Sequence, residues 1–249
     1  MQRKEMLDFA EETFEQNKNS MSKLYDLDLE GFKVVEEKFE DCFPDINVIE
    51  EEIPELVPIL KEAYKDGLMT FFGFGRKINV RTDNIALAMN ERNSSYTDDE
   101  IEHGIPDLYL RQVIQHASLH EMGHDFIFEH YRFAHTPGFK SAPGYEHIWL
   151  PSEEAVADLL AFEYFWENED RLAKCLMRGA SIDDLILLKD STERISELKK
   201  EKKVKKEKSY LDTQNIVLSH LEVEYHDLGL KGITRYLDNM INDHFPEYS

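Results

Sequence analysis

The residues with the clearest chemical potential are His120, Glu121 and His124, which form the pattern H-E-x-x-H. They lie in an apolar-periodic stretch, residues 107–130, that predicts one long helix. At about 100° per residue, positions 120 and 124 project from nearly the same helix face about 6 Å apart along the axis, so two imidazoles can bind one metal ion. Zinc lowers the pKa of a water molecule towards neutrality, and the neighbouring Glu121 carboxylate can then accept a proton while hydroxide attacks a carbonyl group.

A catalytic zinc needs a third protein ligand, and the sequence offers two candidates. The first is His130, six residues after His124, as in the longer pattern H-E-x-x-H-x-x-G-x-x-H. Ile127 occupies the glycine position, and a β-branched residue resists the positive φ that would turn the chain there. If the helix continues through Ile127, His130 points away from the face that carries His124.

The second candidate is Glu154, near the start of a second predicted helix, residues 152–167. Pro151 and Ser152 form a helix-start signal, and acidic residues follow in the first turn. Glu154 and Asp158 are one turn apart on a common face. Glu154 can complete the site as a carboxylate ligand, and Asp158 can accept the second ring N–H of a ligand histidine. The neighbouring strip of this helix is apolar and consists of Ala155, Leu159 and Phe162.

The two motifs together, H-E-M-G-H at 120–124 and E-A-V-A-D at 154–158, resemble the gluzincin metallopeptidases. This thermolysin-like group has H-E-x-x-H on one helix and E-x-x-x-D on the next. The resemblance covers residues 107–162 and is specific to the superfamily. It implies one zinc ion bound by His120, His124 and Glu154, with Glu121 as catalytic base and Asp158 as the carboxylate behind a ligand histidine. It also implies peptide or protein substrates.

Thermolysin-like enzymes also place a tyrosine and a histidine around the metal to stabilise the transition state. Tyr145, in the loop before the second ligand helix, is the best candidate for this role, with His147 beside it. Tyr225 and His226 are more distant alternatives. Tyr145 fits an ordinary surface aromatic equally well. His147 and His226 are of a type that is more often a plain surface or hydrogen-bonded histidine than a catalytic one. His116, one turn before His120, is expected to support or pack rather than bind metal.

A small sheet is expected upstream of the motif, in residues 68–90. The segments 77–81 and 85–89 alternate in polarity, with residues 82–84 as a turn, and so predict an antiparallel hairpin. Residues 85–90 are the candidate edge that would bind the substrate backbone by strand addition. An ordinary packed hairpin fits the same pattern.

The expected fold is α+β with helix dominant: a zincin-like metallopeptidase core with a small antiparallel sheet. Residues 1–66 predict a helical N-terminal region, residues 67–168 the catalytic core, and residues 169–249 a helical C-terminal region of three or four helices. Pro44 and Pro54 are expected breaks. The buried positions expected in the N-terminal region are Phe9, Phe14, Leu24, Phe32, Val35 and Phe39.

Composition narrows the classes of partner. The 249 residues are 41% hydrophobic, enough for a proper core. With 29 basic and 51 acidic residues, the net charge of −22 disfavours nucleic acid and anionic lipid, despite a lysine-rich run at 199–208. Without an apolar membrane span or signal peptide, the expected location is the cytoplasm. Cys42 and Cys175 cannot form a disulfide framework.

Two functions from different classes follow from these patterns. The first is a zinc-dependent peptidase that hydrolyses peptide bonds with a metal-activated water. The second is a non-catalytic or latent regulatory or binding protein, which keeps the metal for stability or has its cleft plugged. In the latent case, the helical C-terminal region would fold over the site.

Overall fold

The computed structural model describes residues 1–42, 57–58, 64, 67–176, 180–200 and 208–248. The chain forms two compact units, each built from separate segments. Unit 1 contains Met1–Gln16, Gly31–Ser118 and Ala173–Leu198, and unit 2 contains Asn17–Glu30, Leu119–Leu172 and Lys199–Ser249. Two long helices, α1 (Arg3–Tyr25) and α7 (Ile105–His130), have residues in both units. Among the described residues, no helix is long and apolar enough to span a membrane.

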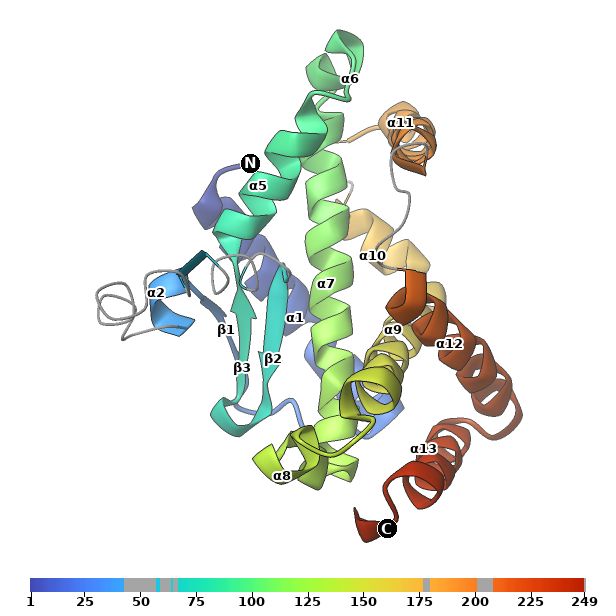
Figure 1. Cartoon of the computed structure of the whole chain (residues 1–249). Helices are drawn as coiled ribbons and strands as arrows, with labels where there is room; N and C mark the ends of the chain where they lie inside the picture. Colours follow the sequence, from blue (N-terminus) through green and yellow to red (C-terminus); the bar gives the residue numbers. More distant parts are fainter. Residues whose placement is uncertain (43–56, 59–63, 65–66, 177–179, 201–207, 249) are drawn as a thin grey trace. The chain divides into compact units, whose positions relative to one another are not determined.

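Unit 1 contains a mixed sheet of three strands, β1 (Lys33–Glu36), β2 (Met69–Phe72) and β3 (Lys77–Val80). The strand order is β1-β3-β2, with β1 parallel and β2 antiparallel to β3 (Figure 1). The expected strand at 77–81 is therefore present, and it does form a hairpin. Its hairpin partner is the preceding segment β2, joined to it through the short helix η1 (Gly73–Gly75).

The prediction of a second strand at residues 85–89 is wrong, because these residues lie in the helix α5 (Thr82–Asn93). The expected turn at 82–84 is the first turn of this helix, and the proposed substrate-binding edge at 85–90 does not exist. Ile85 and Met89 are buried, whereas Leu87 is 43% exposed, as expected when positions four apart share a helix face. The Asn84 amide donates to the carbonyl groups of Tyr64 and Gly67, at 2.7 and 2.8 Å, and so fixes the helix start.

The other elements among the described residues of unit 1 are helices. Buried side chains that include Tyr96, Ile105 and Leu188 pack into one apolar cluster. The helix α6 (Asp98–Glu102) begins with a capping box, in which Thr97 and Glu100 satisfy each other's backbone N–H groups. The remaining helices with residues in unit 1 are α2 (Phe39–Cys42), α6 (Asp98–Glu102), α10 (Glu169–Leu176) and α11 (Ile182–Lys200).

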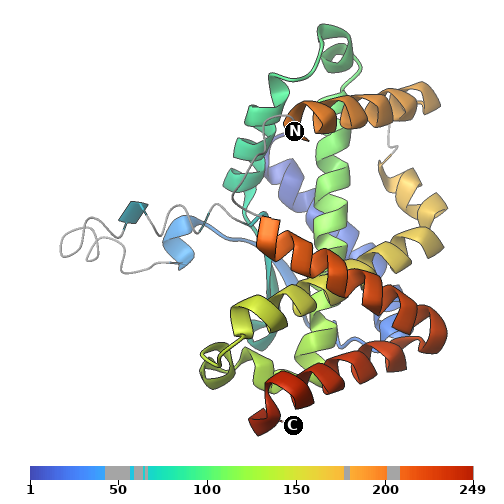
Figure 2. The same ribbon diagram turned by 45° about the vertical axis from the view of Figure 1, so that its right-hand side comes forward.

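Unit 2 is built around α9 (Leu150–Glu167), which packs against α12 (Lys208–Leu228), and α12 in turn packs against α13 (Leu230–His244) (Figure 2). Aromatic rings hold the start of α9 in place: the Phe139 ring lies 5.1 Å from that of Trp149 and 4.9 Å from that of Phe245. The short elements of this unit are η2 (Arg132–His135), α8 (Pro137–Lys140), the π-helical turn η3 (Tyr145–Trp149) and η4 (Pro246–Tyr248).

The two helices that carry the H-E-x-x-H and E-x-x-x-D patterns, α7 and α9, begin two residues earlier than predicted, at 105 and 150, and end as predicted, at 130 and 167. Downstream of 169, the described residues form four helices, within the predicted range. Of the expected core positions, Phe14 and Phe32 are buried, and Phe9, Val35 and Phe39 are half-buried. Leu24 is exposed, because Met21 and Tyr25 occupy the buried face of α1. Pro44, Pro54 and most of the lysine-rich run lie outside the described residues.

Candidate metal centre

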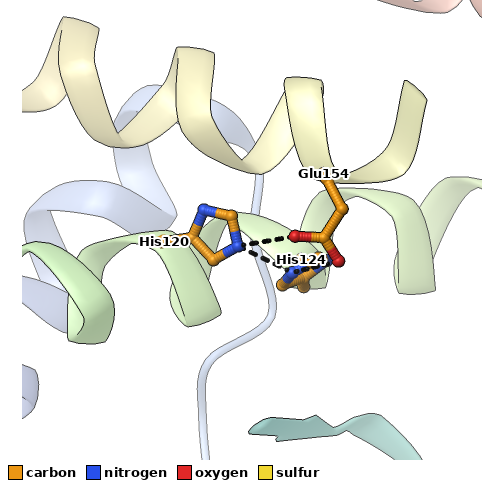
Figure 3. Close-up of side chains that lie close together, drawn as sticks. All are labelled: His120, His124 and Glu154. Carbon is orange, nitrogen blue, oxygen red and sulfur yellow. Dashed lines mark hydrogen bonds and ion pairs between the residues drawn. The ribbon is translucent and has the colours of Figure 1, made fainter. Parts of the chain in front are cut away.

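Three potential ligands come together in unit 2. His120 and His124 lie one turn apart on α7, and Glu154 lies in the first turns of α9 (Figure 3). One donor atom from each of the three residues lies within 4.8 Å of the other two. The Nε2 atom of His120 is 3.1 Å from Nε2 of His124 and 3.2 Å from Oε2 of Glu154, and His124 Nε2 is 3.8 Å from Glu154 Oε1.

These separations fit a zinc ion. Zinc–nitrogen and zinc–oxygen bonds of about 2.0–2.1 Å in a tetrahedral arrangement place neighbouring donor atoms about 3.3 Å apart. The 3.1 Å between the two Nε2 atoms and the 3.2 Å from His120 Nε2 to Glu154 Oε2 are close to that value. The 3.8 Å from His124 Nε2 is to the other carboxylate oxygen, Oε1, so Glu154 faces each histidine with a different oxygen. Two imidazole nitrogens and one carboxylate oxygen also form a donor set that zinc accepts in catalytic sites. Since their electron pairs converge, a positive charge between them, a metal ion or protons, stabilises the arrangement.

A glycine allows α7 and α9 to approach closely enough to build this cluster. A Cβ atom at Gly123 would lie 2.9 Å from the carbonyl oxygen of Ala157 and 3.0 Å from its Cα. Both of these are backbone atoms, which cannot rotate away. Ala157 is itself fully buried and small. The Gly123–Ala157 crossing therefore brings the carboxylates of α9 to the histidines of α7.

Asp158 supports His120 in the way the motif implies. The Nδ1 atom of His120 lies 2.7 Å from Oδ1 of Asp158, and since a carboxylate only accepts, the ring donates this hydrogen bond. The Nε2 atom is then the one that faces the cluster. Gln214, on α12, donates from Nε2 to the other oxygen of Asp158 at 2.8 Å. This contact depends on how α12 packs on α9, and the sequence patterns did not suggest it.

Glu153 supports the second histidine, which was not expected. Its Oε1 atom lies 3.4 Å from Nδ1 of His124, and its Oε2 atom accepts a hydrogen bond of 3.1 Å from Nε1 of Trp149. The sequence assigns Glu153 only to the acidic first turn of a helix. The pair Glu153-Glu154 was the available signal, because adjacent helix positions differ by about 100° and can serve two neighbouring groups of one site.

The electrostatics favour a cation in the cluster. Burial opposes charge on His120, yet its hydrogen bonds to Asp158 and Glu154 raise its pKa to about 10. Burial also opposes charge on His124, and Glu153 raises the pKa of that ring. The pKa of Glu154 is lowered, because the nearby His120 outweighs the effect of burial. Without metal, the proton on His120 therefore balances the carboxylates, and a divalent cation can take its place.

The candidate catalytic groups differ in how close they lie to the cluster. Glu121 is buried, and its charge raises the pKa of both His120 and His124. Tyr145 is half-buried, and burial together with the charges of Glu153 and Glu154 raises its pKa to about 12, so it lies within electrostatic reach of α9. His147, two residues further on, is exposed.

The other candidate histidines lie elsewhere. The helix continues through Ile127 as its side chain predicts, and His130 Nδ1 lies 2.9 Å from the carbonyl oxygen of Phe126. His116 is exposed on α7, and His226 is exposed 3.7 Å from Glu163.

One histidine near the site was missed by the sequence analysis. Burial lowers the pKa of His135, while the charges of Glu153 and His124 also act on it. It lies in η2, outside any recognised motif.

Comparisons of the chain with protein-family models, with curated proteins and with solved structures found no match. The function is therefore inferred from the side chains of α7 and α9 and from their surroundings.

Proposed function

We propose that this chain is a zinc-dependent hydrolase that cleaves peptide bonds, similar in its site to the gluzincin metallopeptidases. The observation that supports this best is the convergence of His120, His124 and Glu154 from two helices, with donor separations that suit zinc. Glu121, between the two histidines in sequence and buried beside them, supplies the base that such a reaction needs. A cluster made only for packing would not need this set of converging polar groups.

The bound zinc would lower the pKa of a water molecule and polarise the substrate carbonyl group. Glu121 accepts a proton from the attacking water and later passes it to the leaving amine. Tyr145 remains protonated at neutral pH, since its pKa is raised to about 12, and its phenol O–H donates to the negative oxygen that develops on the substrate. Asp158 keeps the His120 ring in the orientation and tautomer that present Nε2.

The test is Glu121→Gln, which keeps the shape of the side chain and removes its basicity. Zinc should stay bound at one equivalent per chain, while cleavage of casein or of a fluorogenic peptide library falls by about 10²–10⁴-fold. The matched control is Glu146→Gln, an exposed site with the same change in charge, which should keep both properties. If Glu121→Gln cleaves like the control, Glu121 is not the base.

A second candidate function is a latent or purely metal-binding protein. It is favoured by α12, which packs on α9 and donates a hydrogen bond from Gln214 to the carboxylate behind His120. In that case the full-length chain would bind one zinc ion and cleave neither casein nor the peptide library. Chelator-sensitive cleavage by the wild-type chain would exclude this alternative.

A further inference from the structure

We propose that Glu153 is a positioning residue for His124 and that it strengthens zinc binding at the site. This inference rests on the zinc site proposed above and assigns a role to a residue outside both motifs. It makes α9 the source of three functional carboxylates: one ligand, Glu154, and one supporting group for each histidine on α7.

Glu153 is enclosed by specific partners. Only 8% of its surface is exposed, so its charge is largely removed from water. An ionised carboxylate in such a place needs partners for both oxygens. Trp149 Nε1 lies 3.1 Å from Oε2, and His124 Nδ1 lies 3.4 Å from Oε1, within ion-pair range and long for a hydrogen bond. Each oxygen therefore faces one ring nitrogen.

The donor and acceptor rules then determine the tautomer of His124. The indole N–H of Trp149 only donates, and it holds Oε2 in place. Oε1 is negatively charged and only accepts, so at 3.4 Å it favours a proton on the His124 nitrogen that faces it, Nδ1. The remaining nitrogen, Nε2, is the one 3.1 Å from Nε2 of His120, and its electron pair is directed into the ligand cluster. This arrangement repeats on His124 what Asp158 does for His120.

Replacing Glu153 with glutamine tests this arrangement with little change in volume. The amide has one oxygen, and because Trp149 and His124 face different oxygens of the carboxylate, that one oxygen can accept from only one of them. Whichever donor it serves, its NH₂ group faces the other donor. Loss of such a supporting group reduces metal affinity by about 10–100-fold. Glu153→Gln should therefore weaken zinc binding by that factor while the cluster ligands stay unchanged.

The experiment uses the full-length chain and measures zinc affinity by competition with a chromophoric chelator at fixed pH. Wild type is compared with Glu153→Gln and with Glu146→Gln, the exposed control with the same charge change. Circular dichroism verifies folding. The visible absorption spectrum of the Co²⁺-loaded chain, which reports ligand geometry, should change for Glu153→Gln and not for the control. A second variant, Trp149→Phe, keeps the Glu153 charge but removes the donor that orients it, and should weaken zinc binding by about 3–10-fold.

The outcomes separate this inference from its premise. If the wild-type chain binds no zinc, both the proposed function and the role of Glu153 are wrong. If wild type binds one zinc ion, and both Glu153→Gln and Trp149→Phe bind it within about twofold of the control with unchanged Co²⁺ spectra, only the role of Glu153 is overturned. A weaker affinity together with a changed spectrum supports the role, because a purely structural residue would not alter the ligand field.

Discussion

Replacing Gly123 with alanine should weaken both the fold and the metal site, because this glycine lies where α7 and α9 cross. The added Cβ would lie 2.9 Å from the carbonyl oxygen of Ala157, whereas an ordinary contact begins at 3.4 Å. The neighbouring atoms belong to the backbone, so the two helices must separate by about 0.5 Å at this point. Catalytic and metal sites tolerate displacements of only about that size.

Two effects on the free energy of unfolding oppose each other in this variant. Alanine in a helix interior is favoured over glycine by about 1 kcal/mol. Overpacking a well-packed contact costs about 1–3 kcal/mol, and the upper part of that range applies when the obstacle is backbone. The net effect should be destabilisation by about 1–2 kcal/mol, which lowers Tm by about 2–8 °C for a chain of this size. Wider separation of His120 and His124 from Glu154 should also reduce zinc affinity about tenfold, or 1.4 kcal/mol.

The assay is thermal unfolding with and without zinc, followed by competition with a chelator. The matched control is Gly138→Ala, on α8 of the same unit, where the new Cβ would meet only the Tyr248 hydroxyl at an ordinary 3.7 Å. This control should keep its zinc affinity and lose no stability. If Gly123→Ala matches the control in both Tm and zinc affinity, the close crossing does not position the ligands.

Three further predictions concern charge and hydrogen bonding. Tyr145→Phe should lower kcat by about 10²–10³-fold and leave zinc affinity unchanged; a change in KM alone would contradict its role in the transition state. The pKa of His120 is about 10 without metal, so zinc must displace a proton from this ring when it binds. The apparent zinc affinity should therefore rise about tenfold per pH unit between pH 6 and 8, and a zinc affinity that does not change with pH would contradict this. Burial would raise the pKa of Glu100, but hydrogen bonds from Ser191 and Arg194 lower it to about 2. The contribution of the ionised Glu100 to the stability of the fold is therefore present above pH 4.5 and is lost as the pH falls towards 2. In urea unfolding, the free energy of unfolding of the wild type should fall by about 2 kcal/mol more than that of Glu100→Gln between pH 5 and pH 2. This figure is reduced because Arg194 is partly exposed to solvent.

The helices α7 and α9 could be predicted because their apolar periodicity extends over many turns, whereas α5 could not be predicted. Ile85, Leu87 and Met89 alternate as a strand would, yet Ile85 and Met89 are also four apart and share a helix face. Contacts with residues distant in the sequence favour the helix over the strand. The main ones are the hydrogen bonds from the Asn84 amide to the carbonyl groups of Tyr64 and Gly67. A twelve-residue window does not contain that information.

Some residues of the candidate site could likewise be predicted from the sequence, and others could not. His120, His124, Glu154 and Asp158 could be found from the sequence because each pair is one turn apart on its own helix, and helix geometry alone places both members on one face. Glu153 could not, because its role depends on the angle at which α9 passes α7. Gln214 depends in addition on the packing of α12 against α9.

The distances within the cluster thus depend mainly on how α7 and α9 cross. The sequence of neither helix alone determines this crossing. Each helix presents its polar groups within about one and a half turns, so the groups on one helix move together as a rigid set. A small shift at the crossing would change the distances from Glu154 to both histidines and the contacts of Glu153 and Asp158 at once. Stability and metal affinity should therefore change together for substitutions at this crossing, and independently for substitutions in the donor groups themselves.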